Sequence, residues 1–470
     1  MKFNEVKVIS KPDAFISLPD ALRQNREQVL ENHKKHLNSG LAMMFNLLDF
    51  NKLFVRAEGC RVWDSEGNEY LDFLGAYGAL NVGHNHPRLL KAMEQVREWP
   101  NLLQASLSAL SGALAHNLAA ITPAGLERCF FCNSGAEAVE GALKLARAAT
   151  GKQRLVYCEN SFHGKTMGAL SVTGRLKYQK AFQPLLKDAV PVPYGDLPAL
   201  EKILADRLTA AFILEPIQGE AGIITPPSGY LAEAKDLCVK YDALMILDEI
   251  QTGLGRTGTM FAFEQEGLIP DILCLAKSLG GGVMPIGVFI TGNDIWDKAY
   301  GGMEKALLHT STFGGNTWAM AAGITALEVL FEENLMANAK ETGDYLLAGL
   351  RRLRETHPII KETRGRGLLT GIEFNQTEGF ASKATFGLAT KLSQEYFGSL
   401  IAGELMNRHR IITAYTLNNP NVIRLEPPLC VTKREIDVLL EALDSLLNKH
   451  KSFSGLAASG AKTVIKSLFK

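Results

Sequence analysis

Three ionisable side chains follow apolar runs within residues 212–282. Glu215 follows FIL, Asp248 ends LMILD, and Lys277 follows ILCLA. Apolar runs of this kind are typical of central strands in a parallel sheet, where both faces are buried. Because ligands of open α/β sheets bind beyond the carboxyl ends of the strands, we expect these three side chains to share one crevice.

The residue types at this crevice indicate a cofactor. A buried carboxylate such as Asp248 needs a cationic or hydrogen-bonding partner to stay ionised. A protonated pyridine nitrogen is such a partner, and a lysine can hold the same cofactor as a Schiff base. Ser134 and Gly135 lie between a predicted strand, 126–131, and a helix whose free N–H groups favour a phosphate. Each feature alone has an ordinary structural explanation, but pyridoxal phosphate (PLP) accounts for all of them together.

The surrounding pattern predicts the elements that position these residues. Strands at 155–158 and 212–214 alternate with helices at 176–187, 198–206 and 230–241, the order of a mainly parallel sheet with helices on both faces. Two helices at 322–335 and 337–356 lead to a smaller α+β domain. It contains the strands GLLTGIEF and NVIRLEPP, a helix at 384–409 and a last helix opened by a capping box from Thr432 to Glu435.

We expect an α/β protein with four regions. Residues 1–75 would form an N-terminal arm and part of the small domain, with a helix at 20–37 and a hairpin within 55–74. Residues 76–335 would form the large domain, 336–449 the small domain, and 450–470 a tail. The segment GAYGALNVGHNHP carries Tyr77 and two histidines, His84 and His86, and is predicted to be a loop in the wall of the pocket.

Composition excludes several classes of function. Lys plus Arg and Asp plus Glu number 50 each, which leaves no basic field for nucleic acid and no polybasic membrane patch. The seven scattered cysteines favour a reduced, cytoplasmic protein. Cys129 and Cys132 are interpreted as core residues rather than metal ligands, because positions i and i+3 of a strand face opposite ways. The first residues lack the features of a signal peptide, and the apolar run at 40–50 is too short to span a membrane.

Six motifs occur in the order of a known family: SGAEAVEGALKLAR, FHGK, EPIQGE, LDEIQTGLGRTG, AKSLGGG and STFGGN. Through them residues 40–449 resemble class III (ω-amino) PLP-dependent aminotransferases, which have fold type I. Within that family FFCNSG, PDILCLAK, GGGVMPIG and TLNN…IRLEPPL are most similar to putrescine aminotransferases, and ornithine aminotransferases come next.

The resemblance implies roles at the cofactor. Lys277 would form the Schiff base and later carry a proton, and Asp248 would pair with the pyridine nitrogen. Gln251 would bind the phenolic oxygen, and Phe162 would stack on the ring. The remaining cofactor contacts implied are Ser134, Gly135 and Ala136 at the phosphate, His163, and Thr312 of a neighbouring subunit. The contact of Thr312 with a neighbouring subunit implies a homodimer with shared active sites, and two dimers could pair into a tetramer.

The resemblance also implies how substrates bind. Glu220 and Arg424 would form a gate that closes for an amine and opens so that Arg424 binds the α-carboxylate of 2-oxoglutarate. Tyr77 and Lys165 would contact substrate, and Glu215 would be a structural acid. Lys165 stands where ornithine aminotransferases have an arginine, which favours a diamine donor such as putrescine. The alternatives are an ornithine-type donor and an aldehyde or ketone of a biosynthetic pathway. A non-catalytic PLP-binding module is disfavoured, because Lys277, Asp248 and Gln251 are all present.

Overall fold

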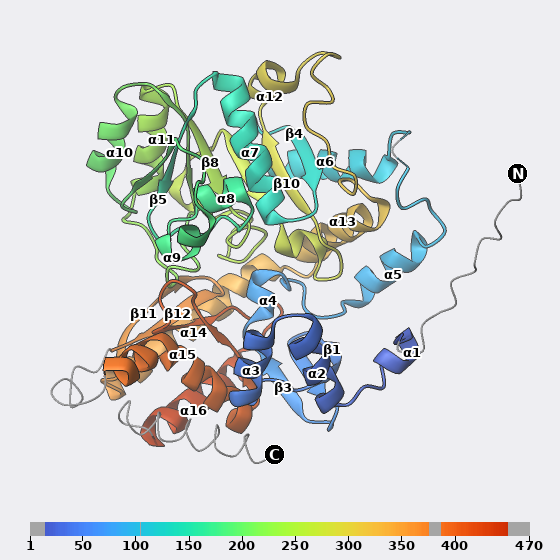
Figure 1. The fold of residues 1–470 in the computed structure, drawn as a ribbon, viewed down its shortest axis with the longest axis vertical. Coiled ribbons are helices and arrows are strands. Elements are labelled where there is room, and N and C mark those ends of the chain that lie inside the picture. The colour runs from blue at the N-terminus through green and yellow to red at the C-terminus, as the bar shows by residue number, and fades with distance from the viewer. Residues whose placement is uncertain (1–14, 104, 376–386, 450–470) are drawn as a thin grey trace, which may run out of the picture.

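The computed structural model describes residues 15–103, 105–375 and 387–449, without the side chains of 387–397. A large α/β body is joined to a smaller sheet flanked by helices (Figure 1). The body is built on a seven-stranded sheet in the order β4-β10-β9-β8-β7-β5-β6. Its strands are β4 (Arg128–Cys132), β5 (Arg154–Cys158), β6 (Ala189–Val192), β7 (Thr209–Leu214), β8 (Leu244–Asp248), β9 (Ile272–Leu275) and β10 (Gly287–Thr291).

The strands that lead to the three ionisable residues are neighbours in this sheet. β7 pairs in parallel with β8, and β8 pairs in parallel with β9. Their carboxyl ends therefore meet at one edge, as predicted. β10 is antiparallel to both β9 and β4, so the sheet is mainly rather than wholly parallel. The predicted mainly parallel sheet is confirmed.

Alternate residues of each strand enter two different hydrophobic clusters. Met245 and Leu247 of β8 belong to one cluster, while Ile246 between them belongs to the other. The helices that cover the two faces or flank the sheet are α6 (Ala109–Ile121), α7 (Gly135–Thr150), α8 (Met167–Ser171), α10 (Leu197–Leu204), α11 (Tyr230–Lys240), α12 (Asn293–Tyr300) and α13 (Thr317–Glu332). Cys129 packs against the first cluster and Cys132 lies in the second, which confirms both as core residues on opposite faces.

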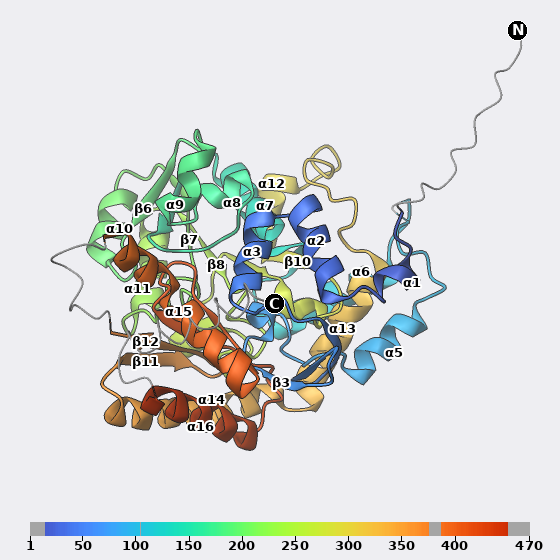
Figure 2. The same cartoon turned by 60° about the horizontal axis from the view of Figure 1, so that its bottom comes forward.

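A second sheet follows the large one in the chain. Its antiparallel strands have the order β11 (Ile360–Arg366), β12 (Leu369–Phe374), β15 (Val422–Leu425) and β14 (Ala414–Tyr415). In Figure 2, α14 (Leu335–Thr356) and α16 (Lys433–Lys449) lie beneath β11 and β12, and α15 (Gly387–His409) lies above them. Thr432 and Glu435 form the predicted capping box of α16, since each backbone N–H donates to the other side chain.

The N-terminal segment forms its own sheet beside the small one. β1 (Phe54–Glu58), β2 (Arg61–Asp64) and β3 (Glu69–Asp72) pair antiparallel, as the predicted hairpin region requires. A short strand from the other end of the chain, β13 (Ile411–Ile412), pairs in parallel with β3. Between this sheet and α6 lie α4 (Gly75–Gly78) and α5 (Pro87–Gln95).

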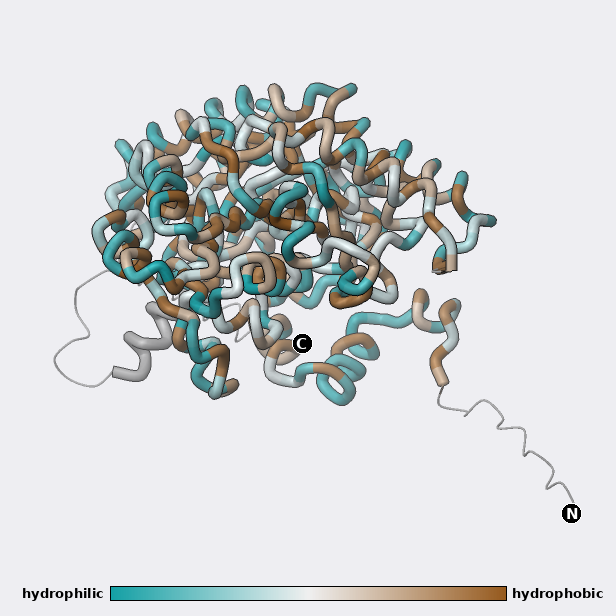
Figure 3. Tube along the Cα trace, turned by 90° about the horizontal axis from the view of Figure 1, so that it is seen from above, coloured by the Kyte–Doolittle hydropathy of each residue, from teal (hydrophilic) through white to brown (hydrophobic). Residues whose placement is uncertain are grey.

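The single helix predicted at 20–37 is wrong. The chain forms α1 (Leu18–Ala21) and then α2 (Arg26–His36), followed by α3 (Ser39–Leu47). Asn25 and Gln28 form a capping box, which starts a new helix in the middle of the predicted one. Leu22 and Leu37 are 78% and 73% exposed, so these two apolar side chains are not covered by the described part of the chain. In Figure 3 the arm that follows the N-terminal trace lies at the edge of the molecule and is largely hydrophilic.

Other predicted boundaries also change. The helix at 176–187 is only α9 (Leu176–Gln179) and a 3-10 turn, η1 (Lys180–Phe182), because Pro184 disfavours a helical conformation at the residue before it. Five strands escaped prediction, and two of them, β13 and β14, are only two residues long. β6 is an edge strand with a proline, β11 is mostly polar, and β10 follows a Gly- and Pro-containing segment. The predicted tail at 450–470 lies outside the described residues. Each helix that is described is too short or too polar to cross a bilayer.

One buried arginine joins the parts of the molecule. Arg256, in the loop after β8, has no exposed surface. Its Nη2 donates to Asn81 Oδ1 at 2.6 Å, and its Nη1 donates to the carbonyl oxygens of Leu368, at 3.1 Å, and Pro427. Asn81 precedes α5, whereas Leu368 and Pro427 flank strands of the small sheet. A single guanidinium thus connects three segments that are far apart in the sequence.

Replacing Arg256 by Met should lower the thermal unfolding midpoint by at least about 5 °C, because three buried acceptors lose their donor. Differential scanning calorimetry of the two proteins measures the shift. The control is Arg366→Met, which removes a partly exposed arginine bound to Glu266 at 3.0 Å. We expect a much smaller shift there, since such pairs contribute little. Equal shifts of the unfolding midpoint in the two variants would show that the buried hydrogen bonds of Arg256 stabilise the protein no more than a partly exposed ion pair does.

Candidate active site

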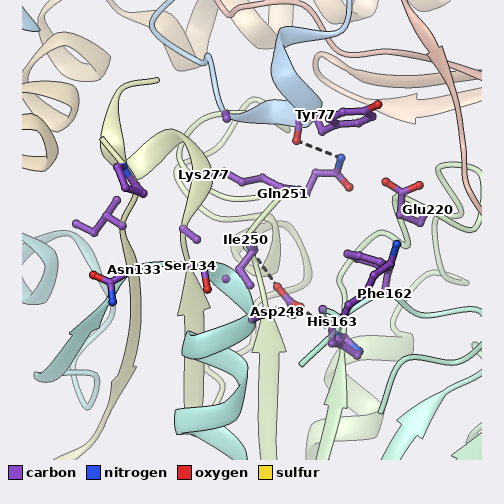
Figure 4. Close-up of a pocket in the computed structure, with 18 of the residues that line it drawn as sticks. Tyr77, Asn133, Ser134, Phe162, His163, Glu220, Asp248, Ile250, Gln251 and Lys277 are labelled. Atoms are coloured by element: carbon purple, nitrogen blue, oxygen red, sulfur yellow. Dashed lines mark hydrogen bonds and ion pairs between the residues drawn. The ribbon is translucent and has the colours of Figure 1, made fainter. Parts of the chain in front are cut away.

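A cavity of about 730 Å³ lies at the carboxyl ends of β7, β8 and β9. Most of the predicted site residues contribute to its wall (Figure 4). Those brought together are Tyr77, Ser134, Gly135, Ala136, Phe162, His163, Lys165, Glu220, Asp248, Gln251 and Lys277. Glu215 also lines it, whereas Arg424 lies behind Glu220 and Tyr77. The crevice predicted from the strand ends is therefore present.

Asp248 is held by two hydrogen-bonding groups. It ends β8 and is buried, and its Oδ2 lies 2.7 Å from Nδ1 of His163. Its Oδ1 accepts the backbone N–H of Ile250 at 3.1 Å. Nε2 of His163 is buried and has no hydrogen-bond partner among the described residues. This arrangement fixes the orientation of the carboxylate at the floor of the cavity.

Lys277 follows β9 on the neighbouring strand end, at the start of the 3-10 turn η3 (Lys277–Gly280). Its φ of 47° is in the left-handed region, where backbone strain is common at functional sites. Burial lowers the pKa of the Lys277 ammonium, and the carboxylates of Glu426 and Glu220 partly offset this effect. A lysine with a lowered pKa is a better nucleophile near neutral pH because more of it is the free amine.

The first turn of α7 provides an anion site. Ser134 is the N-cap of this 16-residue helix, and its Oγ accepts the N–H of Glu137 at 3.2 Å. Gly135 fits tightly here, since a Cβ at this position would come within 2.8 Å of the Ile250 side chain. The free N–H groups and the positive end of the helix dipole favour a phosphate at the cavity wall. The amine, the buried acid, the anion site and the Phe162 ring together fit PLP.

Glu215 has the structural role that was predicted. Its carboxylate accepts the N–H of Phe162 at 2.9 Å and that of Gly219 at 3.1 Å. Burial raises the pKa of Glu215 to about 7, although the neighbouring His163 and the two N–H donors oppose the rise. The side chain ties the segment that carries Phe162 to the loop that carries Glu220.

Glu220 and Arg424 form a buried ion pair. Oε2 of Glu220 lies 2.5 Å from Nη2 of Arg424, and Leu417 donates its N–H to the same oxygen at 2.9 Å. Burial alone would raise the pKa of Glu220, but the guanidinium of Arg424 and the N–H of Leu417, with Lys277, together outweigh burial and lower it. The guanidinium also lies 5.1 Å from the centre of the Tyr77 ring. In this state the arginine is shielded from the cavity.

Sequence reasoning missed Glu426, which lies next to this pair. Oε2 of Glu426 accepts from Nε2 of Gln251 at 3.0 Å and lies 3.7 Å from Nη1 of Arg424. Gln251 also lies 3.5 Å from the carbonyl oxygen of Tyr77. The sequence does contain one indication of Glu426. It is a charged residue in IRLEPP that comes directly after a predicted strand with no polar alternation. Arg256, in the motif LGRTG, was missed for a similar reason.

Of the other residues predicted to line the pocket or bind the cofactor, Lys165 is in the cavity wall, whereas the two histidines and Thr312 are not. Lys165 lines the cavity with its Nζ 4.8 Å from the Tyr178 ring and 5.9 Å from the Phe162 ring. The two histidines expected in the pocket wall are not there. His84 binds Asp72 at 2.8 Å, and His86 binds Glu333 at 2.9 Å. These contacts fix the position of the segment that links β3 to α5. Thr312 is exposed and outside the cavity wall, and its contact with a second subunit stays a prediction.

A metal centre has no support in the described part of the chain. It contains no group of three or more His, Cys, Asp or Glu residues placed to hold an ion. The polar groups of the cavity are instead those already assigned to an organic, anionic cofactor.

A mainly parallel sheet with this lysine, acid and anion site defines a PLP-dependent transferase of fold type I. The chain belongs to the class-III aminotransferases, whose family model matches residues 48–447. It is 36% identical to aminotransferase PigE of Serratia sp. (strain ATCC 39006) over 94% of its length, and it spans only 56% of that longer protein.

Solved structures agree with this family. The chain is similar to ornithine aminotransferase from Toxoplasma gondii ME49, with 32% identity, a TM-score of 0.79 and coverage of 94% of this chain and 98% of that one. It is also similar to acetylornithine aminotransferase from Elizabethkingia anophelis, with 30% identity, a TM-score of 0.74 and coverage of 91% and 100%. Another structure of the Toxoplasma gondii enzyme is described as having PLP at partial occupancy in its active site. The predicted class and cofactor are thereby confirmed.

Replacing Asp248 by Asn should lower kcat by about 10²-fold or more, because a preorganised charge is removed from the cavity. The matched control is Glu249→Gln. Glu249 is equally buried but bonds to Thr252 and to the N–H groups of Ala262 and Phe263, and it does not line the cavity. Steady-state kinetics at saturating cofactor compares the two variants. A control variant as slow as Asp248→Asn would contradict a specific role for Asp248.

Proposed function

We propose that this protein moves a terminal amino group from a diamine of the putrescine type to 2-oxoglutarate, giving an amino-aldehyde and glutamate. The observation that carries the proposal is the Glu220–Arg424 pair. While the pair is closed, the guanidinium is hidden from an amine substrate. When Glu220 moves away, Arg424 can bind the α-carboxylate of 2-oxoglutarate through two parallel hydrogen bonds. One cavity can thus accept two unlike substrates in turn.

Different residues of this chain have different roles in the proposed reaction. When bound, PLP supplies the group that carries the amine and withdraws electrons from the substrate carbon. Lys277, Asp248, Phe162, Gln251 and the start of α7 would hold it. With its lowered pKa, the Lys277 Nζ can accept a proton from the substrate carbon and would deliver it to the cofactor instead of back to that carbon. Asp248, oriented by His163, keeps a negative charge at the floor of the cavity.

The wall of the cavity supports a short aliphatic donor. Phe162, Ile250, Val283, Met284 and Leu417 give it a largely apolar surface. Such a surface suits the methylene chain of a diamine. The wall also contains the carboxylates of Glu215, Glu220 and Asp248, which would attract the ammonium at the far end of that chain.

A second candidate is an aminotransferase that acts on an aldehyde or ketone of a biosynthetic pathway. The observation that favours it is Lys165, a cation in the same wall. Lys165 favours a diamine over ornithine, because it lacks the paired donors of an arginine, but it would also repel the second ammonium of a diamine. An uncharged carbonyl compound would not be repelled. An ornithine-type donor is less well supported, since a lysine binds carboxylate as a point charge and lacks the paired donors of an arginine.

We also propose a homodimer with shared active sites. The segment that carries Thr312 is exposed, and it lies near several large apolar side chains that are exposed on this chain: Met303, Leu307, Leu308 and Phe313. A second copy would cover them. Analytical ultracentrifugation tests this, and a monomer at micromolar concentration would contradict it.

Replacing Arg424 by Ala should slow the half-reaction with 2-oxoglutarate by about 10²-fold or more, because a buried charge pair to the substrate is lost. The half-reaction with the amine should change only a few-fold. Stopped-flow absorbance of the bound cofactor follows each half separately. Arg366→Ala is the control, since Arg366 binds Glu266 at 3.0 Å and is absent from the cavity wall. Equal losses in both half-reactions would contradict the gate.

A donor panel of putrescine, cadaverine, ornithine and 4-aminobutyrate decides the substrate. We expect the highest kcat/KM for putrescine or cadaverine. A clear preference for ornithine would overturn the diamine proposal. If the diamines fail but aliphatic aldehydes are aminated with glutamate as donor, the second candidate is correct.

A further inference from the structure

Glu426 is a buried acid with no role in the proposed reaction so far. It follows β15, has no exposed surface and is not part of the cavity wall. Its Oε1 is buried and has no hydrogen-bond partner within the described residues. Gly78 packs against it so closely that a Cβ there would come within 2.5 Å of this oxygen. The fold therefore leaves space for a carboxylate at this point and for little else.

Arg424 has two carboxylate neighbours, and they differ in freedom. Glu220 lies at 2.5 Å, in a loop between Gly219 and Gly222. Glu426 lies at 3.7 Å, at the end of a strand, with its second contact to Gln251 at 3.0 Å. A loop residue can move aside for a substrate, whereas a strand-end residue bonded to its neighbour stays in place. Glu426 is thus the permanent partner of the guanidinium.

A permanent counter-ion changes what happens when Glu220 moves away. A buried guanidinium without any carboxylate would be strongly destabilised. With Glu426 in place, Arg424 keeps a partner during opening. The incoming substrate then brings a third carboxylate to a guanidinium that already has Glu426 beside it, and the like charges repel. Arg424 consequently holds the substrate less tightly than it would alone.

We propose that Glu426 is a specificity-determining residue, a fixed second counter-ion that weakens the hold of Arg424 on a substrate carboxylate. This rests on the proposed binding of 2-oxoglutarate by Arg424. A weaker hold allows glutamate to leave and lets a donor without a carboxylate compete for the same cavity. The chemical class of ligand that Glu426 acts against is the dicarboxylate.

The charges around Glu426 set how its effect depends on pH. Arg256, Arg424 and Lys277 favour its ionised form, while Glu220 opposes it. Burial outweighs them and raises the pKa of Glu426 above its ordinary value. As the pH falls through this raised pKa, Glu426 takes up a proton and its repulsion of a substrate carboxylate disappears. Dicarboxylate binding to the wild-type enzyme should then become tighter.

The direct test is the affinity of the PLP-loaded enzyme for glutarate, an unreactive dicarboxylate, measured by titration calorimetry. Glu426→Gln keeps the size of the side chain and an oxygen that can accept from Gln251, and it removes the charge. We expect glutarate to bind on the order of tenfold more tightly to this variant. The difference from wild type should shrink as the pH is lowered. The KM for 2-oxoglutarate should fall, whereas the amine half-reaction should change by a much smaller factor, which reflects only the effect of Glu426 on the pKa of Lys277.

Two further variants separate charge from structure. Glu426→Asp keeps the charge and should stay near the wild-type affinity. Glu373→Gln removes a carboxylate that binds Arg364 in the adjoining strand, away from the cavity, and should leave glutarate binding unchanged. If Glu426→Gln does not fold, the pH dependence of glutarate binding to wild type and to Glu426→Asp still decides the matter.

Unchanged or weaker glutarate binding in a folded Glu426→Gln protein would overturn the inference, and so would a difference from wild type that is the same at every pH. These results would leave the proposed function intact if wild type still uses 2-oxoglutarate. A wild-type enzyme that neither binds glutarate nor reacts with 2-oxoglutarate would overturn both.

Discussion

The parallel pairing of β7, β8 and β9 is the constraint on which the site depends. These strands are covered on both faces, so a charged side chain can occur only where a strand ends. Since parallel strands end at the same edge, Glu215, Asp248 and Lys277 are brought together by the sheet itself. The cavity is the place where a buried sheet can present charge to a ligand without placing charge in its core.

Charges at this edge are stabilised in different ways, and the difference matches their roles. Glu215 and Asp248 are held by backbone N–H groups or by a histidine, which fix the side chains in position. Glu220 accepts one backbone N–H, from Leu417, and is otherwise paired with the guanidinium of Arg424, the pair that must part in the proposed gate. The proposed function thus combines a rigid floor for the cofactor with an adjustable wall for the substrates.

The sequence allowed the floor of the site to be predicted, because the strand pattern places Asp248 and Lys277 by rules that are local. The pairing of Glu220 with Arg424 could be predicted only through the family resemblance, since no local rule links the two positions. Glu426 and Arg256 escaped prediction because the partners of a buried charge are set by tertiary packing. The prediction of a single helix at 20–37 failed for a local reason. Asn25 caps a new helix at a point where the hydrophobic spacing indicated that one helix continued.

The pairing of β13 with β3 has a consequence for how the chain folds. Leu71 lies opposite Ile411, so β3 acquires this neighbour only after the long intervening part of the chain has been made. Contacts between such distant residues form slowly, since a long loop must close first. During translation the edge of β3 remains unpaired until β13 has been made, and exposed strand edges can pair with other chains. The N-terminal sheet of this enzyme is therefore completed only by residues 411–412, far along the chain from its other strands.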